Sequence, residues 1–280
     1  MYRSIFFSLL SLLLVQPVFA QSTRIIDEIK NHQEGTKIWW AGHNSWIIKS
    51  GDLVVTTDIF LEEENRIDPL PITAEELAEV IDISFVSHWH GDHFNGYTSR
   101  ILSENSACTF VLPENALDDA EQFGIPENRI VVAKPRESFE IMGIQVNALR
   151  AIHGNKDFAI YYQANLQDVG YKFIINGTSF VQPGDSYLLE DHLFLEDVDV
   201  LFVSPTEHNM YIDRSVILIN RLNPDYIFPQ HHSTLVVTDD NRFWADGYPH
   251  EVEKRLSEAL KQKYHILEPG DSWVIERRSP

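Results

Sequence analysis

The densest group of possible metal ligands in this 280-residue chain is the run His88-Trp89-His90-Gly91-Asp92-His93. It directly follows the apolar run ISFVS, which predicts a β-strand. Because a strand places alternate side chains on one face, His88 and His90 can converge on one metal ion. Asp92 and His93 lie further along the turning loop and can face a second ion beside it. The spacing therefore predicts a metal site, and a solvated histidine-rich loop is the alternative interpretation.

Two ions need more donors than this loop has, because zinc commonly takes four donors and a catalytic site keeps a place for water. His153, Asp185 and His231 each come at the C-terminal end of a predicted strand. Taken singly, such a residue is more often a hydrogen-bonded structural residue. Together with the first motif, the three predict a completed site. His208 also follows a strand and can protonate a leaving group, although an ordinary surface histidine is the slightly favoured interpretation.

The elements that must position these residues arrive in two series. Short apolar runs rich in β-branched and aromatic residues predict strands that begin at residues 37, 45, 53, 83, 109, 130, 146, 159, 171, 178, 198 and 226. Asn176-Gly177 predicts a two-residue hairpin turn. Helices are expected after Thr73, with a capping box to Glu76, and over about residues 214–222 and 251–263. Two mixed sheets packed face to face with helices outside, a layered α/β body, fit this order.

The amino-acid composition favours a globular domain and argues against a nucleic-acid-binding protein. The chain is 44% hydrophobic and 23% charged, with 13 Gly, 13 Pro and one Cys, which is typical of a globular domain. The formal net charge of −20 argues against a nucleic-acid partner, because polyanions are held by cationic side chains. Cys108 has no partner for a disulfide and is expected to be a buried packing residue.

The first twenty residues predict a secretory signal peptide. They combine Arg3, an apolar run over residues 5–15, Pro17 and a small Ala20 before Gln21. The apolar run is shorter than the roughly 20 residues that cross a bilayer as a helix. We therefore expect a single domain over residues 21–280, without a transmembrane segment, in the periplasm or secreted.

The ordered set H-x-H-x-D-H, strand-end His, Gly-Asp and Pro-x-His resembles the metallo-β-lactamase superfamily of binuclear metallohydrolases. The segments WAGHNSWI and LVVTTD, between Trp40 and Asp58, are similar to the branch that includes ascorbate-phosphate lactonases and N-acyl phosphatidylethanolamine phospholipases. The resemblance covers Lys37 to Ile275. It implies a four-layer αβ/βα sandwich of two mixed β-sheets with helices outside.

The resemblance also implies a ligand set. One metal would be held by His88, His90 and His153, the other by Asp92, His93 and His231, and Asp185 would bridge the two. His232 could replace His231 if the strand end shifts by one residue. Asp58 is expected to orient ligand histidines, and His43 to do the same or to line the pocket, with an ordinary turn histidine as the alternative.

The implied activity is hydrolysis of an ester, lactone, amide or phosphodiester bond in a small-molecule or lipid-derived substrate. Two divalent ions lower the pKa of a shared water from about 15.7 toward about 7, and Asp92 and Asp185 would orient the resulting hydroxide. Histidine nitrogen suits Zn²⁺, and mixed His and carboxylate ligation also accommodates Mn²⁺ or Fe.

Two other functions are alternatives. One is β-lactam hydrolysis, against which Asp185 counts, because antibiotic-degrading members with the same loop typically lack the bridging Asp. The other is a protein that binds a metal or ligand without turnover, against which the full ligand set counts. The sequence leaves the substrate, the physiological metal and the oligomeric state open.

Overall fold

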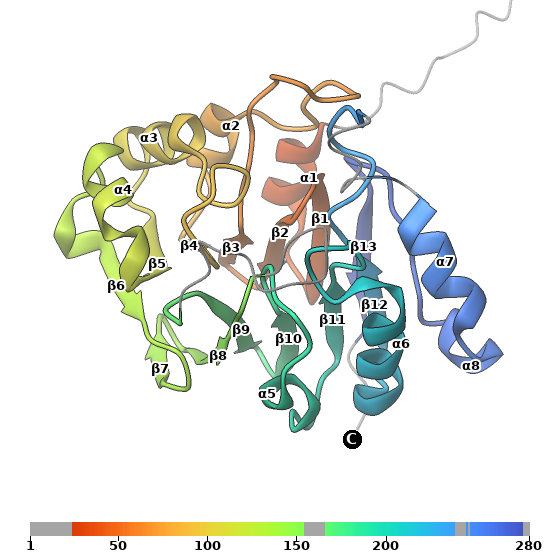
Figure 1. Ribbon diagram of the computed structural model, residues 1–280. Coiled ribbons are helices and arrows are strands. Elements are labelled where there is room, and N and C mark those ends of the chain that lie inside the picture. Colours follow the sequence, from red (N-terminus) through yellow and green to blue (C-terminus); the bar gives the residue numbers. More distant parts are fainter. Residues whose placement is uncertain (1–23, 154–165, 239–244, 246, 277–280) are drawn as a thin grey trace, which may run out of the picture.

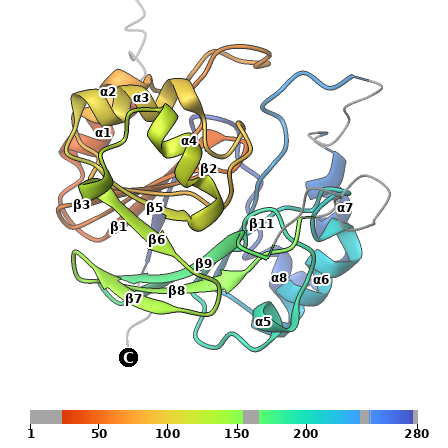
Figure 2. The same cartoon turned by 60° about the vertical axis from the view of Figure 1, so that its left-hand side comes forward.

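The computed structural model describes residues 24–153, 166–238, 245 and 247–276 of the chain. In this part of the chain, two β-sheets pack face to face and helices cover their outer faces (Figure 1, Figure 2). The elements in chain order are α1 (Ile25–Asn31), β1 (Thr36–Gly42), β2 (Ser45–Ser50), β3 (Leu53–Thr57), α2 (Ala74–Ala78), β4 (Ile83–Phe85), α3 (Gly96–Asn105), β5 (Thr109–Pro113), η1 (Glu114–Ala116), α4 (Leu117–Gln122), η2 (Glu127–Arg129), β6 (Ile130–Ala133), β7 (Ser138–Ile141), β8 (Ile144–Arg150), β9 (Val169–Ile175), β10 (Thr178–Gln182), α5 (Glu190–Leu193), β11 (Val200–Val203), α6 (Tyr211–Leu222), β12 (Tyr226–Pro229), α7 (Gly247–Arg255), α8 (Glu258–Lys261) and β13 (Ser272–Ile275).

Both sheets are mixed. The first has the strand order β13-β1-β2-β3-β4-β5-β6, antiparallel from β13 to β3 and parallel from β3 to β6. The second has the order β12-β11-β10-β9-β8-β7, parallel from β12 to β10 and antiparallel beyond. The predicted four-layer sandwich of two mixed sheets is confirmed.

Alternation along the strands produces the layers. In β1, Ile38 and Trp40 join the core between the two sheets, whereas Trp39 and Ala41 join the core beneath the helices, and all four are fully buried. Successive side chains of a strand point to opposite faces, so a strand covered on both sides reads as a continuous apolar run. This is why β1 and β2 show no polar alternation in the sequence.

The helices form the two outer layers. Figure 2 shows α1 to α4 over the first sheet and α5 to α8 beside the second. Leu77 of α2 and Leu102 of α3 pack into the core beneath the first set of helices. Leu218 of α6 and Val252 of α7 pack into the core of the second set. Each of these four helices thus packs a buried apolar side chain against the sheet that it covers.

Two local predictions are confirmed. Asn176 and Gly177 join β9 to β10 with positive φ angles of 48° and 80°, as a two-residue hairpin turn with the right twist requires. Thr73 caps α2: its side chain accepts from the backbone N–H of Glu76, and the Glu76 side chain accepts from the backbone N–H of Thr73.

The helix expected over residues 251–263 is wrong as one element. The chain forms α7 and α8, and Ser257 between them has an extended backbone and accepts a hydrogen bond from the Leu260 N–H, so it starts a new helix. Val252 in α7 and Leu260 in α8 keep the apolar spacing of a single helix, so the sequence pattern does not show the break between the two helices.

Other elements were missed. Helix α3 buries Thr98, Ser99 and Ser103 beside its single fully buried leucine, so it lacks an apolar stripe that sequence periodicity can detect. Strands β7 and β13 are four-residue strands at the edges of their sheets, so their hydrophobic pattern is too short to predict a strand. The strand expected at residue 159 and the leader over residues 1–20 lie outside the described residues.

Cys108 is fully buried as expected, and burial raises the pKa of its thiol to about 12. Among the helices of the described segments, none has both the length and the apolar character that crossing a membrane requires.

The core between the sheets should dominate stability. Phe173 on β9 is fully buried and stacks on Phe85 at 5.1 Å between ring centroids, whereas Phe194 is 74% exposed. Phe173→Ala is expected to lower the free energy of unfolding by about 3–5 kcal/mol, because it removes buried surface and leaves a cavity. Phe194→Ala is the matched control and should change it by less than about 0.5 kcal/mol. Urea denaturation followed by circular dichroism measures both, and equal effects would contradict the assignment of this core.

Candidate metal centre

Strand ends from both sheets meet at one edge of the sandwich. In the first sheet, the turn between β1 and β2 supplies His43, the end of β3 supplies Asp58, and the loop after β4 carries residues 88–93. In the second sheet, the candidate residues that follow strands are His153 after β8, Asp185 after β10, His208 after β11 and His231 after β12. Because β3 and β4 are parallel, and β10, β11 and β12 are parallel, their carboxyl ends point to a common edge.

The carboxylate of Asp185 lies at the centre of the cluster. Its Oδ2 is 3.4 Å from Nε2 of His153 and 3.2 Å from Nε2 of both His208 and His231. Its Oδ1 is 3.5 Å from Nε2 of His93. Asp185 is only 3% exposed, so one carboxylate that is almost entirely buried has four imidazole rings around it.

The first group of possible ligands consists of His88, His90 and His153. Their ring centroids are 4.6 Å, 4.8 Å and 5.3 Å apart, and one ring nitrogen of each lies within 4.8 Å of the others. The strand-to-loop transition after β4 thus brings His88 and His90 to one side, as the spacing predicts.

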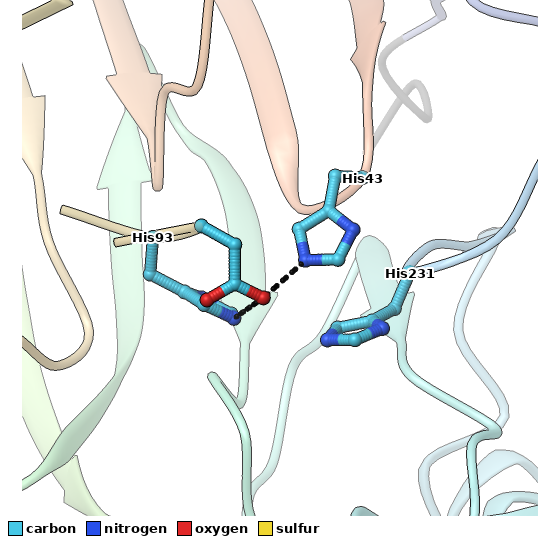
Figure 3. Close-up of side chains that lie close together, drawn as sticks. His43, His93 and His231 are labelled. Carbon is cyan, nitrogen blue, oxygen red and sulfur yellow. Dashed lines mark hydrogen bonds and ion pairs between the residues drawn. The ribbon is translucent and has the colours of Figure 1, made fainter. Parts of the chain in front are cut away.

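The second group consists of Asp92, His93 and His231, with His43 beside them. Figure 3 shows the rings of His43, His93 and His231 converging from three separate segments of the chain. The Asp92 side chain is 31% exposed, whereas those of His43 and His93 are fully buried. Asp92 therefore forms the solvent side of this group.

Asp58 and Ser87 fix the rings of His88 and His93, which are both buried. Asp58 accepts hydrogen bonds from Nδ1 of His93 at 3.0 Å and from the Ser87 hydroxyl at 2.8 Å. Since the hydroxyl hydrogen of Ser87 is used in this way, its oxygen accepts from Nδ1 of His88, 3.0 Å away. Both imidazoles therefore carry hydrogen on Nδ1 and point Nε2 toward the centre, the tautomer that a metal ligand needs.

The environment of His93 favours a cation. Burial alone would lower its pKa, but the carboxylates of Asp185, Asp92 and Asp58 raise that pKa well above its ordinary value. In the same way, burial alone would raise the pKa of Asp185, but His231 and His93 hold it well below the ordinary range. A divalent cation would supply the positive charge that these three carboxylates stabilise.

Three buried nitrogens supply an independent test of fit. Nε2 of His88 and both ring nitrogens of His231 have no hydrogen-bond partner. Burial lowers the pKa of His231 to about 4, so its ring is neutral at neutral pH and offers a lone pair. A buried polar atom without a partner costs about 1–3 kcal/mol, which a metal ion bound there would remove. The donor set therefore fits divalent metal ions.

His232 points away from the cluster. Its ring packs on Trp40 with 4.7 Å between centroids, and its Nε2 donates to the carbonyl oxygen of Pro229. The structure thus places His231, and not its neighbour, against Asp185. His43 also lies in the cluster, with Nε2 3.0 Å from Oδ2 of Asp92.

Sequence reasoning missed two amides. The side chains of Asn44 and Asn209 are fully buried, and each donates a hydrogen bond to Oδ1 of Asp185, at 3.1 Å and 2.9 Å. The one available signal was their position directly after His43 and His208, the two histidines whose roles the sequence left open.

The model of a family described as "Beta-lactamase superfamily domain" matches residues 37–231. The chain belongs to this family. A Nanoarchaeum equitans protein named as a metal-dependent hydrolase is 28% identical over 208 residues, which are 71% of this chain and 84% of that one. A second protein named as a metal-dependent hydrolase, from Sulfurisphaera tokodaii, is 26% identical over 244 residues, which are 83% of this chain and 96% of that one.

Solved structures agree on the fold. Igni18, described as a metallo hydrolase of Ignicoccus hospitalis, superposes with a TM-score of 0.68 at 17% identity, over 87% of this chain and 99% of that chain. The protein is thus a metal-dependent hydrolase of the metallo-β-lactamase fold, as the motifs predicted. The lactonase-like branch is not named by these matches and stays a prediction.

A close approach of two loops positions candidate ligands of this β-lactamase superfamily domain. Gly184 precedes Asp185 and has a φ of +64°. A Cβ atom there would lie 2.8 Å from Cβ of Ser87 and 2.9 Å from the carbonyl oxygen of Val169. Only glycine allows the Asp185 loop to lie against Ser87, the neighbour of His88.

Gly184→Ala is therefore expected to destabilise the protein by about 2 kcal/mol or more and to lower its metal content. Gly91→Ala is the matched control within the histidine loop, because a Cβ there has no atom within 4 Å. Thermal unfolding and elemental analysis of both variants measure the difference. A Gly184→Ala protein with wild-type stability and metal content would refute the close approach.

Proposed function

We propose that the protein is an exported hydrolase that holds two divalent metal ions on either side of Asp185. It would cleave an ester, lactone, amide or phosphodiester bond in a small-molecule or lipid-derived substrate. One observation carries this proposal: Oδ2 of Asp185 lies 3.4 Å from Nε2 of His153 in the first group and 3.2 Å from Nε2 of His231 in the second. A carboxylate that reaches both groups can join two ions in one centre.

The proposed ligands are His88, His90 and His153 for one ion and Asp92, His93 and His231 for the other. Six nitrogen or carboxylate donors of this kind suit Zn²⁺ first, and Mn²⁺ or Fe as well. When bound, a pair of such ions supplies a nucleophile at neutral pH and neutralises charge that develops on the substrate oxygen.

Two carboxylates of the chain would orient the attacking water. Asp92 is the carboxylate on the solvent side, and its pKa lies well below the ordinary range because His93 and His43 outweigh the effect of burial. It is therefore ionised at neutral pH and can accept a hydrogen bond from the attacking water. Asp185 would orient that water from the buried side.

His208 would pass a proton to the leaving group. Its Nε2 donates to Oδ2 of Asp185 at 3.2 Å, and burial lowers its pKa to about 4. The ring is therefore neutral at neutral pH, so it would first take up the proton that the attacking water releases and then pass that proton to the leaving group.

Export is proposed from the leader over residues 1–20, with Gln21 as the first residue of a single mature domain. Outside the cytoplasm, hydrolysis by this metal centre would need no cofactor other than the two proposed metal ions.

The metal centre is tested by elemental analysis of residues 21–280, purified without chelator. We expect about two metals per chain, and about one in His88→Ala and in His231→Ala, because each variant removes a ligand of one ion only. Both variants should lose at least about 100-fold in hydrolysis on a panel of esters, lactones, β-lactams and phosphodiesters. His250→Ala, at a 57% exposed side chain, is the control. A metal content near zero, with no uptake of added Zn²⁺ or Mn²⁺, would favour the alternative of a binding protein without turnover. Turnover confined to β-lactams would favour the alternative of an antibiotic-hydrolysing enzyme.

Export is tested by expressing the full chain in a bacterial host and fractionating the cells. We expect the protein in the periplasm or medium with Gln21 at its N-terminus by mass spectrometry. Leu12→Arg, which breaks the apolar run, should retain the uncleaved chain in the cytoplasm. An uncleaved wild-type chain in the cytoplasm would contradict export and leave the metal prediction unaffected.

A further inference from the structure

The β1–β2 turn, residues 42–45, carries two consecutive side chains that contact the two carboxylates of the metal centre. Nε2 of His43 lies 3.0 Å from Oδ2 of Asp92. Nδ2 of Asn44 donates to Oδ1 of Asp185 at 3.1 Å. Both turn residues are fully buried, whereas the Asp92 side chain that His43 contacts is 31% exposed. One short turn thus reaches a carboxylate from each of two loops that lie far apart in the sequence.

Hydrogen bonds to its backbone fix the turn at His43. The His43 N–H donates to Oγ1 of Thr234 at 2.6 Å. The His43 carbonyl oxygen accepts from the indole N–H of Trp40 and from the backbone N–H of His231, both at 3.0 Å. The segment that presents His231 to the centre is therefore tied to the same turn.

The turn also has a constrained backbone. Gly42 has a φ of +96°, and a Cβ there would lie 2.7 Å from Nη2 of Arg66, which donates to the carbonyl oxygen of Ala41. His43 has a φ of +52°, which is uncommon for a residue with a side chain. Such a backbone conformation in a buried non-glycine residue persists only where the surrounding contacts hold it.

The amide of Asn44 is held as firmly as its backbone. Its Oδ1 accepts from the Ser204 hydroxyl at 3.4 Å, and its carbonyl oxygen accepts from the Thr57 hydroxyl at 3.3 Å. Asn209 donates to the same oxygen of Asp185 at 2.9 Å. Two amides therefore donate to Oδ1 of Asp185, which also lies 3.5 Å from Nε2 of His93, and Oδ2 is the oxygen that faces the other three histidines.

We propose that His43 and Asn44 are positioning residues that hold the Asp92 and Asp185 carboxylates in the orientation that two metal ions require. This inference rests on the proposed two-metal function. His43 acts through Asp92, a ligand of one ion, so its loss weakens one metal. Asn44 acts through Asp185, which both ions share, so its loss weakens both.

Direct binding of a metal by His43 is the competing role, since its ring nitrogen lies within 4.8 Å of the ligand atoms of Asp92, His93 and His231. The contact with Asp92 argues against it. A carboxylate only accepts hydrogen bonds, so Nε2 of His43 must carry the hydrogen and has no lone pair for an ion. A side chain that donates a hydrogen bond but binds metals poorly should therefore replace His43.

Four variants of the mature chain test the inference. His43→Asn suits the positive φ but is too short to reach Asp92, His43→Gln keeps an N–H donor, Asn44→Ala removes the donor to Asp185, and His250→Asn is the exposed control. The measurement is competition for Zn²⁺ against a chelator of known affinity, with the absorption spectrum of the Co²⁺-loaded protein as a second readout. Circular dichroism checks that each variant is folded.

The expected result is a loss of about 10–100-fold in affinity for one of two metals in His43→Asn and for both in Asn44→Ala. His43→Gln should stay within about threefold of the wild type and keep its Co²⁺ spectrum. If His43→Gln binds as weakly as His43→Asn, His43 is a direct ligand and the inference is overturned. It is also overturned if His43→Asn or Asn44→Ala binds both metals like the wild type.

A crystal structure of metal-free His43→Asn separates this inference from the proposed function. The Asp92 carboxylate should move by more than about 1 Å relative to the metal-free wild type, because the turn no longer holds it. An unmoved carboxylate would overturn the inference even in a wild-type protein that binds two metals. Failure of the wild type to bind two metals, with Asp92 displaced in the variant, would instead refute the binuclear proposal alone.

Discussion

A carboxylate that is almost entirely removed from water, that of Asp185, is the constraint on which the metal centre depends. A buried charge is costly unless opposite charge and hydrogen bonds compensate it. Here two amides contact one oxygen and three imidazoles face the other. These partners come from the loops after β8, β11 and β12 and from the β1–β2 turn, and Asp185 itself follows β10. Any change that moves one of these loops therefore changes the electrostatic environment of the whole centre.

The sandwich supplies the rigidity that this arrangement needs. The core between the sheets is built from stacked aromatic rings, such as Phe173 between Phe85 and Phe180 and Trp46 against Phe202. Aromatic rings bury large areas and lose little conformational entropy. The ends of the strands are thereby fixed, and loops as short as the one between β10 and Asp185 carry their side chains to defined positions.

Two glycines with positive φ, Gly184 and Gly42, lie where loops approach each other near the metal centre. Gly184 brings Asp185 against Ser87, and Gly42 brings the β1–β2 turn against Arg66 and Thr234. His231 itself has a φ of +66°. Backbone strain of this kind persists only where the surrounding structure holds it, and it clusters at functional sites. Here it lies on both sides of the same centre.

The sequence by itself determined the fold class and the candidate ligands, because strand periodicity and the H-x-H-x-D-H spacing are local properties. It also placed the Thr73 cap and the Asn176-Gly177 hairpin, which depend on neighbouring residues only. Only the tertiary structure decided which of two adjacent histidines, His231 and His232, faces Asp185. It alone revealed the amides of Asn44 and Asn209 and the polar helix α3, because their partners are distant in the sequence and no periodic pattern records contacts across loops.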